Sequence, residues 1–170
     1  SAGAWSQSGD MFAFGSIVGG DAALTILDPR NGDKVVEHRF PGLGEVYTPT
    51  FSPDGRRVAF SAIVGGFTDL FVADVQTGEL RRLTNDLFTD LQPAWSPDGN
   101  TIAMVLSKDG SPDIYLYDLA SGRRNDPACR GFMGLPFTMY YKNGKVAHAT
   151  SSIQNRQQIT SILDEKLNHQ

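Results

Sequence analysis

Short apolar runs alternate with polar turns along most of this chain, and the pattern repeats. In the clearest unit an apolar run ends at Trp95, a polar turn closes at Gly99, and a second apolar run continues to Leu106. Equivalent turns end at Gly9 and Gly55, so the turn glycines are 46 and then 44 residues apart. Proline presets φ in such a turn, and glycine accepts the positive φ at its corner. The chain is therefore built from repeats, each containing a β-hairpin.

A second turn recurs in the same register. An aspartate stands four residues before a glycine at Asp28, Asp74 and Asp118, again 46 and 44 residues apart. Each aspartate follows a run that is apolar on both sides of the pleat, which is typical of a strand covered on both faces. A further strand follows the turn and is clearest at residues 79–84. Four strands in each unit of about 40–50 residues indicate a β-propeller blade.

The repeated motifs resemble the TolB-type β-propeller repeat. They are the Trp/Phe-Ser-Pro-Asp-Gly turn, the Ile/Val-Ala strand after it, the strand ending in aspartate and the Thr/Ser-Gly pair. The resemblance covers residues 4–124 and implies a mainly β fold, a partial β-propeller of about three four-stranded blades. The predicted blades span residues 4–40, 46–84 and 91–124. In the first copy Gln7 and Ser8 replace the proline and aspartate of the turn.

Three blades do not close a ring, because propellers have about four to eight of them. The chain begins at Ser1 without a leader pattern, so we expect a mature form or a fragment of a longer protein. Either the partner blades lie outside this sequence, or the open blade faces cause self-association.

The last 46 residues differ from the repeats, with a net charge of +2 against −6 for residues 1–124. Apolar residues flank Asn143-Gly144, which predicts a β-hairpin. Beyond it, apolar residues recur at helical spacing and predict a helix over about Asn155–Leu167. The residues of this apolar stripe are Ile159, Ile162, Leu163 and Leu167. We therefore predict a C-terminal β-β-α tail over residues 125–170.

Two interpretations of this tail stay open. It resembles the C-terminal β-β-α part of thioredoxin in Gly134-Leu135-Pro136, in Lys142-Asn143-Gly144 and in the Leu-Asp-x-x-Leu of residues 163–167. That resemblance implies that Pro136 is cis. The first half of the thioredoxin fold, with its Cys-x-x-Cys, is absent from this sequence, so the chain would be a chimaera or a natural junction between two folds. The alternative is a degenerate fourth blade, since Gly144 lies 45 residues after Gly99. The helical period favours the first interpretation.

The sequence offers no pattern for catalysis, for a cofactor or for a metal. Cys129 is the only cysteine, so neither an internal disulfide nor dithiol chemistry is predicted. His38, His148 and His169 lack the spacing of metal ligands. There is no Gly-x-Ser-x-Gly elbow and no phosphate loop. We predict no catalytic, cofactor-binding or metal-binding residue.

Two repeated sets of residues have structural interpretations. Asp28, Asp74 and Asp118 precede glycine turns, where capping of the turn is expected in place of calcium binding. The aromatic residues that end the first run of each unit, Trp5, Phe51 and Trp95, are expected in the core between blades. The net charge of −4 excludes a general attraction to nucleic acid or anionic membranes. No apolar run reaches the length of about 18 residues that a membrane span requires.

Three functions remain in competition. The TolB resemblance implies a non-enzymatic module that presents its loops to a protein partner in the bacterial periplasm. The first alternative is the propeller of a larger serine peptidase of the prolyl oligopeptidase type. The second is a thioredoxin-like protein that lacks its dithiol. We favour the protein-binding module.

Overall fold

The structure is a computed structural model that describes residues 3–108, 111–125, 138–142, 145–150 and 156–163. The chain forms two compact units, Ser1–Asn125 and Asp126–Gln170.

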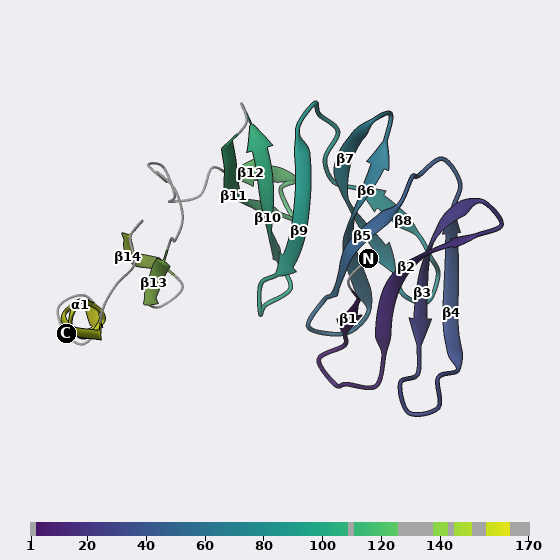
Figure 1. Cartoon of the computed structure of the whole chain (residues 1–170), viewed down its shortest axis with the longest axis horizontal. Helices are drawn as coiled ribbons and strands as arrows, with labels where there is room; N and C mark the ends of the chain where they lie inside the picture. The colour runs from purple at the N-terminus through teal and green to yellow at the C-terminus, as the bar shows by residue number, and fades with distance from the viewer. Residues whose placement is uncertain (1–2, 109–110, 126–137, 143–144, 151–155, 164–170) are drawn as a thin grey trace. The chain divides into compact units, whose positions relative to one another are not determined.

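The first unit consists of three four-stranded antiparallel sheets whose strands follow chain order (Figure 1). The first sheet contains β1 (Ala4–Trp5), β2 (Phe12–Val18), β3 (Asp21–Leu27) and β4 (Lys34–Phe40). The second contains β5 (Val46–Phe51), β6 (Arg57–Val64), β7 (Phe67–Asp74) and β8 (Leu80–Arg82). The third contains β9 (Thr89–Trp95), β10 (Thr101–Lys108), β11 (Ser111–Asp118) and β12 (Arg123–Asn125). The predicted mainly β fold, a partial propeller of three four-stranded sheets, is confirmed.

The turn between the first two strands of each sheet is held by one serine. In the third sheet the Ser96 carbonyl accepts the N–H of Gly99 at 2.9 Å, and the Ser96 hydroxyl accepts the N–H of Thr101 at 2.9 Å. Gly99 has φ +70°, the left-handed conformation that the sequence predicted. In the first sheet Asp10 replaces the missing turn aspartate and accepts a hydrogen bond from Ser6 Oγ at 2.8 Å. The altered first copy therefore forms the same turn.

Replacing Gly99 with valine is expected to lower the free energy of unfolding by about 1–3 kcal/mol, because a β-branched residue is strained at positive φ. A Cβ atom at this position would meet only ordinary contacts, at 3.7 Å from Arg57 and Pro53, so the loss would come from the backbone. Gly99→Asn is the matched control, since asparagine tolerates this conformation. Urea unfolding measures both variants, and equal stability of Gly99→Val and the parent would contradict the turn assignment.

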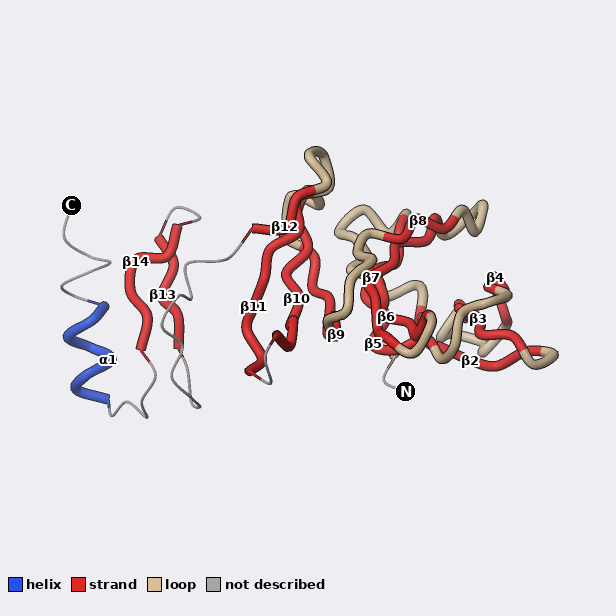
Figure 2. Tube along the Cα trace, turned by 90° about the horizontal axis from the view of Figure 1, so that it is seen from above, coloured by secondary structure: helices blue, strands red, loops and turns tan. Residues whose placement is uncertain are grey.

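The second sheet is buried on both faces because it lies between the other two (Figure 2). Alternate residues of β6 point to opposite sides: Val58 and Phe60 pack in the cluster shared with the first sheet, and Ala59 packs in the cluster shared with the third. The same division separates Phe71 from Leu70 in β7. Double-sided burial explains why most positions of these two strands are apolar.

The second unit contains the hairpin of β13 (Thr138–Lys142) and β14 (Lys145–Thr150), followed by α1 (Arg156–Ile162). The predicted helix is thus present in the part of this segment that the structure describes, and within its predicted stripe Ile159 and Leu163 are exposed. Pro136 and Leu167 lie outside the described residues. None of the described stretches forms a helix with the length and apolar character that a membrane span requires.

Candidate functional site: a groove across the inner strands

A groove of about 380 Å³ crosses the ends of the first strands of the three sheets, β1, β5 and β9. Its lining residues are Trp5, Gln7, Thr50, Phe51, Ser52, Pro53, Ala94, Trp95 and Pro97. The groove is a product of the repeat, because equivalent positions of successive sheets meet there. Trp5, Phe51 and Trp95 share one repeat position, and Gln7, Pro53 and Pro97 share the position two residues later.

Trp95 forms a fixed wall of this groove. Its indole Nε1–H donates a hydrogen bond to the Thr50 carbonyl of the second sheet at 3.0 Å. The Arg57 guanidinium lies 4.7 Å from the centre of the Trp95 ring, a cation–π contact. Arg57 Nη2 also donates to the Gly99 carbonyl at 3.2 Å. These contacts join the second and third sheets and hold the ring in one orientation.

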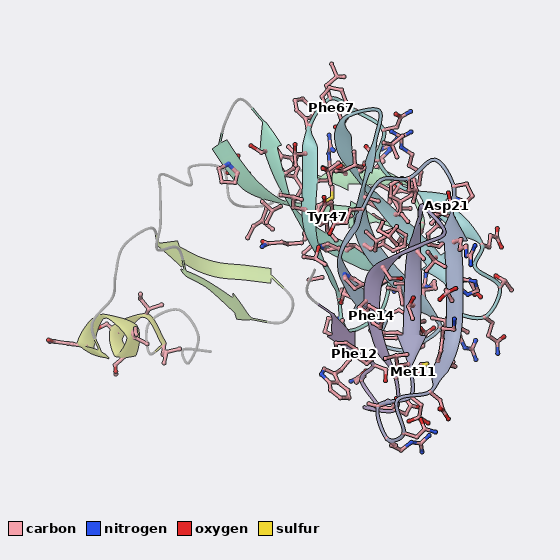
Figure 3. All side chains as sticks on the ribbon, turned by 45° about the vertical axis from the view of Figure 1, so that its right-hand side comes forward. Met11, Phe12, Phe14, Asp21, Tyr47 and Phe67 are labelled. Carbon is pink, nitrogen blue, oxygen red and sulfur yellow. The ribbon has the colours of Figure 1, made fainter. Side chains whose placement is uncertain are left out.

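Trp5 lies in a different environment from its two repeat equivalents. Phe51 is 7% exposed and Trp95 packs on the second core cluster, as predicted for residues between blades. Trp5 is instead 60% exposed, so the prediction of a core position is wrong for this residue. The reason is that Trp5 pairs with Phe12 of β2, and neither residue belongs to the core cluster that the first sheet shares with the second. The two rings make an edge-to-face contact at 5.2 Å, and Figure 3 shows Phe12 and Phe14 near one another on β2.

Two residues with unusual backbone geometry stand beside the groove. Thr48 has φ +44° and Gln92 has φ +52°, and these are the non-glycine residues with positive φ in the described part of the chain. They occupy equivalent positions two residues before Thr50 and Ala94, where the strand ladders shift register. Bulges of this kind redirect side chains and are common next to functional sites. The sequence analysis missed them, although the repeated residue-proline pairs at 48–49 and 92–93 were a visible signal.

The turn carboxylates next to the groove are ionised at neutral pH. A hydrogen bond from Ser52 holds the pKa of Asp54 below its usual range, and Ser96 does the same for the pKa of Asp98. Each carboxylate also accepts an N–H two residues ahead, from Arg56 and from Asn100. These hydrogen bonds stay within the turns, so the aspartates shape the edge of the groove and contribute negative charge there.

The aspartates of the second recurring turn cap their own turns, as predicted. Asp74 Oδ1 accepts the N–H groups of Gln76 at 2.9 Å and Thr77 at 2.8 Å, and Asp118 Oδ1 accepts the N–H of Ser121 at 2.6 Å. In the first sheet Arg30 donates to Asp28 through its N–H and its guanidinium, and the side-chain bonds lower the pKa of Asp28 to about 2. Within the described residues, no three histidine, cysteine or acidic side chains are grouped so as to hold a metal ion.

The histidines and the cysteine are scattered along the chain. His38 Nε2 lies 2.8 Å from the Val75 carbonyl and joins β4 to the turn after β7, away from the residues that line the groove. His148 lies in β14, in the second unit. Cys129 and His169 lie outside the described residues.

Comparison with known proteins gives consistent matches. A family model described as the TolB β-propeller domain matches residues 2–168. The Tol-Pal system protein TolB of Gluconobacter oxydans is 33% identical over 76 residues, which are 45% of this chain and 16% of that protein. The crystal structure of TolB from Acinetobacter baumannii is similar with a TM-score of 0.66 and 29% identity, covering 79% of this chain and 32% of that one. The chain thus spans less than a third of the length of these relatives.

More distant structures share the fold alone. A prolyl endopeptidase structure has a TM-score of 0.55 and 18% identity, over 73% of this chain and 21% of that one. The family match includes the tail, and the resemblance of residues 125–170 to thioredoxin is not supported.

Proposed function

Because the chain belongs to the family of TolB β-propeller domains, we propose that it is a non-catalytic module that binds a protein partner in the periplasm. The observation that carries the proposal is the groove, where the three sheets contribute aromatic residues from the same repeat position. Tryptophan is enriched among the residues that dominate protein interfaces, since it buries a large area and offers one donor. Trp5 is suited to that role because it is one of the lining residues of the groove and is 60% exposed.

The relatives support a proposal for the class of partner. The Gluconobacter oxydans protein is named as part of the Tol-Pal system, and we propose a protein of a Tol-Pal type system as the partner. We propose a periplasmic location for the chain on the same basis. We propose no cofactor, no metal and no nucleic-acid partner, in keeping with the net charge of −4 and with aspartates that are engaged in their own turns.

The domain organisation extends this proposal. We propose that residues 4–40, 46–84 and 91–124 are three blades and that residues 125–170 form a β-β-α tail, with a degenerate fourth blade as the alternative. The family match through residue 168 supports the alternative. The sheet faces without a neighbouring sheet are proposed to associate with further blades.

A binding experiment tests the function. The Pal protein of Gluconobacter oxydans is titrated into the purified chain, with heat and tryptophan fluorescence as readouts. We expect Trp5→Ala to weaken binding by at least about tenfold, as the loss of a central aromatic side chain does. The parent chain is expected to lose tryptophan fluorescence intensity or shift its emission on binding.

Phe67→Ala is the matched control, since Phe67 is also an exposed aromatic residue but lies at the β6–β7 turn and does not line the groove (Figure 3). This variant should bind like the parent. No binding of Pal by the folded parent chain would overturn the partner assignment, and equal affinities of Trp5→Ala and the parent would overturn the groove as the binding site.

A further inference from the structure

The two interfaces between the sheets have residues of different chemistry at equivalent positions. At the first interface Val46 of β5 is buried in the core cluster, and Leu80 of β8 packs against that cluster. At the second interface the equivalent positions, 44 residues later, hold Asp90 and Arg124. The repeat thus replaces an apolar pair with a charged pair. The connection before the strand changes too, because Asp86 stands where the earlier repeat has Gly42.

Asp90 is buried without a hydrogen bond. It is 0% exposed, and neither of its carboxylate oxygens has a hydrogen-bond partner within the described part of the chain. The nearest cation is Arg124, whose Nη1 lies 3.6 Å from Asp90 Oδ1. A carboxylate that leaves water without hydrogen bonds pays a large desolvation penalty as an ion and a much smaller one as a neutral acid.

Arg124 compensates the charge of Asp90 only in part. Its Nη1 donates to Asp86 Oδ2 at 2.7 Å, whereas its approach to Asp90 at 3.6 Å is an ion pair without a hydrogen bond. The guanidinium also lies over two rings, 5.6 Å from the centre of Tyr115 and 6.0 Å from that of Phe88. The arginine is thus held by Asp86 and the rings, and the buried acid shares it at longer range.

We propose that Asp90, with Arg124 and Asp86, forms a proton-dependent clasp where the third sheet meets the second, since Arg124 of β12 ties the third sheet to the connection that precedes β9. Protonation of Asp90 closes the interface tightly, and ionisation of Asp90 loosens the attachment of the third sheet.

Most of the surroundings of Asp90 favour its protonated form. Burial raises the pKa of Asp90 to about 6, and the carboxylates of Asp86 and Asp69 act in the same direction. The Thr84 hydroxyl and the Arg124 guanidinium oppose the rise in the pKa. The other cation in this region, Arg82, is engaged with Asp69 at 2.5 Å. Asp90 therefore changes charge between pH 5 and pH 7.5.

The sign of the effect follows from linkage. A carboxyl whose pKa is raised in the folded state binds its proton more tightly there than in the open state, where the value returns to about 3.9. The contribution of Asp90 to stability is complete below that value and is lost as pH rises through about 6. For these two values, linkage makes the opening equilibrium of the third sheet about tenfold larger at pH 7.5 than at pH 5.

Amide hydrogen exchange of the full chain tests the clasp. After correction for the intrinsic exchange rates, β9 and β12 should open about tenfold more at pH 7.5 than at pH 5, whereas β2 and β3 should change much less. Asp90→Asn should abolish this difference, because an amide does not titrate. Asp86→Asn should reduce it, because Arg124 is then free to pair with Asp90.

The first interface provides the sequence of a control variant that should fold without the charged residues. The triple variant Asp86→Gly, Asp90→Val, Arg124→Leu copies the first interface into the second, and it should fold with β9 and β12 insensitive to pH. This variant keeps the test decisive if Asp90→Asn fails to fold.

A carbon-13 titration of the Asp90 carboxyl in the parent supplies a direct readout, with a midpoint expected between pH 5 and pH 7. A midpoint below pH 4.5 would overturn the clasp. The clasp would also be overturned if Asp90→Asn or the triple variant kept the pH dependence of the parent, or if all three sheets responded equally.

Discussion

Phe60→Ala is expected to lower the free energy of unfolding by about 3–5 kcal/mol, the usual range for truncating a fully buried phenylalanine. Phe60 is completely buried in β6, at the interface between the first and second sheets. Its ring stacks between Phe40 at 5.7 Å and Phe71 at 5.9 Å. Removing the middle ring takes contacts from both neighbours at once and leaves a cavity between the two sheets. Urea unfolding followed by circular dichroism measures the loss.

Two variants control for this substitution. Phe67→Ala removes an equal side chain from an exposed position, 39% accessible, and should change stability by about 0.5 kcal/mol or less. Phe60→Leu keeps most of the apolar volume and should cost much less than Phe60→Ala. A loss below about 1 kcal/mol for Phe60→Ala would contradict the burial of this ring between the two sheets.

Arg82→Ala is expected to cost about 3 kcal/mol or more, because it leaves the buried Asp69 carboxylate without its counter-ion. Asp69 is 0% exposed, and Arg82 Nη2 lies 2.5 Å from its Oδ2. Arg82 Nε also donates to the Thr84 carbonyl at 2.9 Å, so the guanidinium ties β8 to the segment after it. The side chain of Arg82 is one-third exposed, and solvent reaches the pair from that side. This access places the loss at the lower end of the range for buried ion pairs.

The neighbouring arginine provides the control. Arg81 is exposed on the same strand, and Arg81→Ala should change the free energy of unfolding by about 0.5 kcal/mol or less. The double variant Asp69→Asn, Arg82→Ala should recover part of the loss, since it no longer buries an unpaired charge. If Arg82→Ala and Arg81→Ala are equally mild, then the ion pair contributes nothing to the fold.

The three inter-sheet features have one origin in the repeat. Trp95 and its Thr50 partner join the second and third sheets, the Phe60 stack joins the first and second, and Asp90 with Arg124 adds a charge to the second interface. A repeat protein depends on such nearest-neighbour contacts for its stability. The difference between the Val46 and Asp90 interfaces therefore predicts that the third sheet is the one whose attachment depends on pH.

The local structure of this protein could be predicted from its amino-acid sequence. The Ser-Pro-Asp-Gly turn, the Asp-to-Gly turn and the period of apolar positions predicted the antiparallel strands, the positive φ of Gly99 and the capping by Asp74. All of these depend on contacts between residues a few positions apart, which a single repeat contains within itself. The helix α1 was predicted for the same reason, from the spacing of apolar residues in one segment.

The role of each repeated position, by contrast, depends on how the sheets stack. Trp5, Phe51 and Trp95 are indistinguishable by register, yet one is exposed and two are packed, because burial depends on whether another sheet covers that face. The burial of Asp90 also depends on the stacking of the sheets, whereas its position in the sequence indicated only a polar residue before a strand. Its partner Arg124 is 34 positions away, and its burial follows from the stacking of one sheet on the next. Repeats specify their own strands through short-range contacts, whereas exposure, charge pairing and the groove arise where the repeats meet.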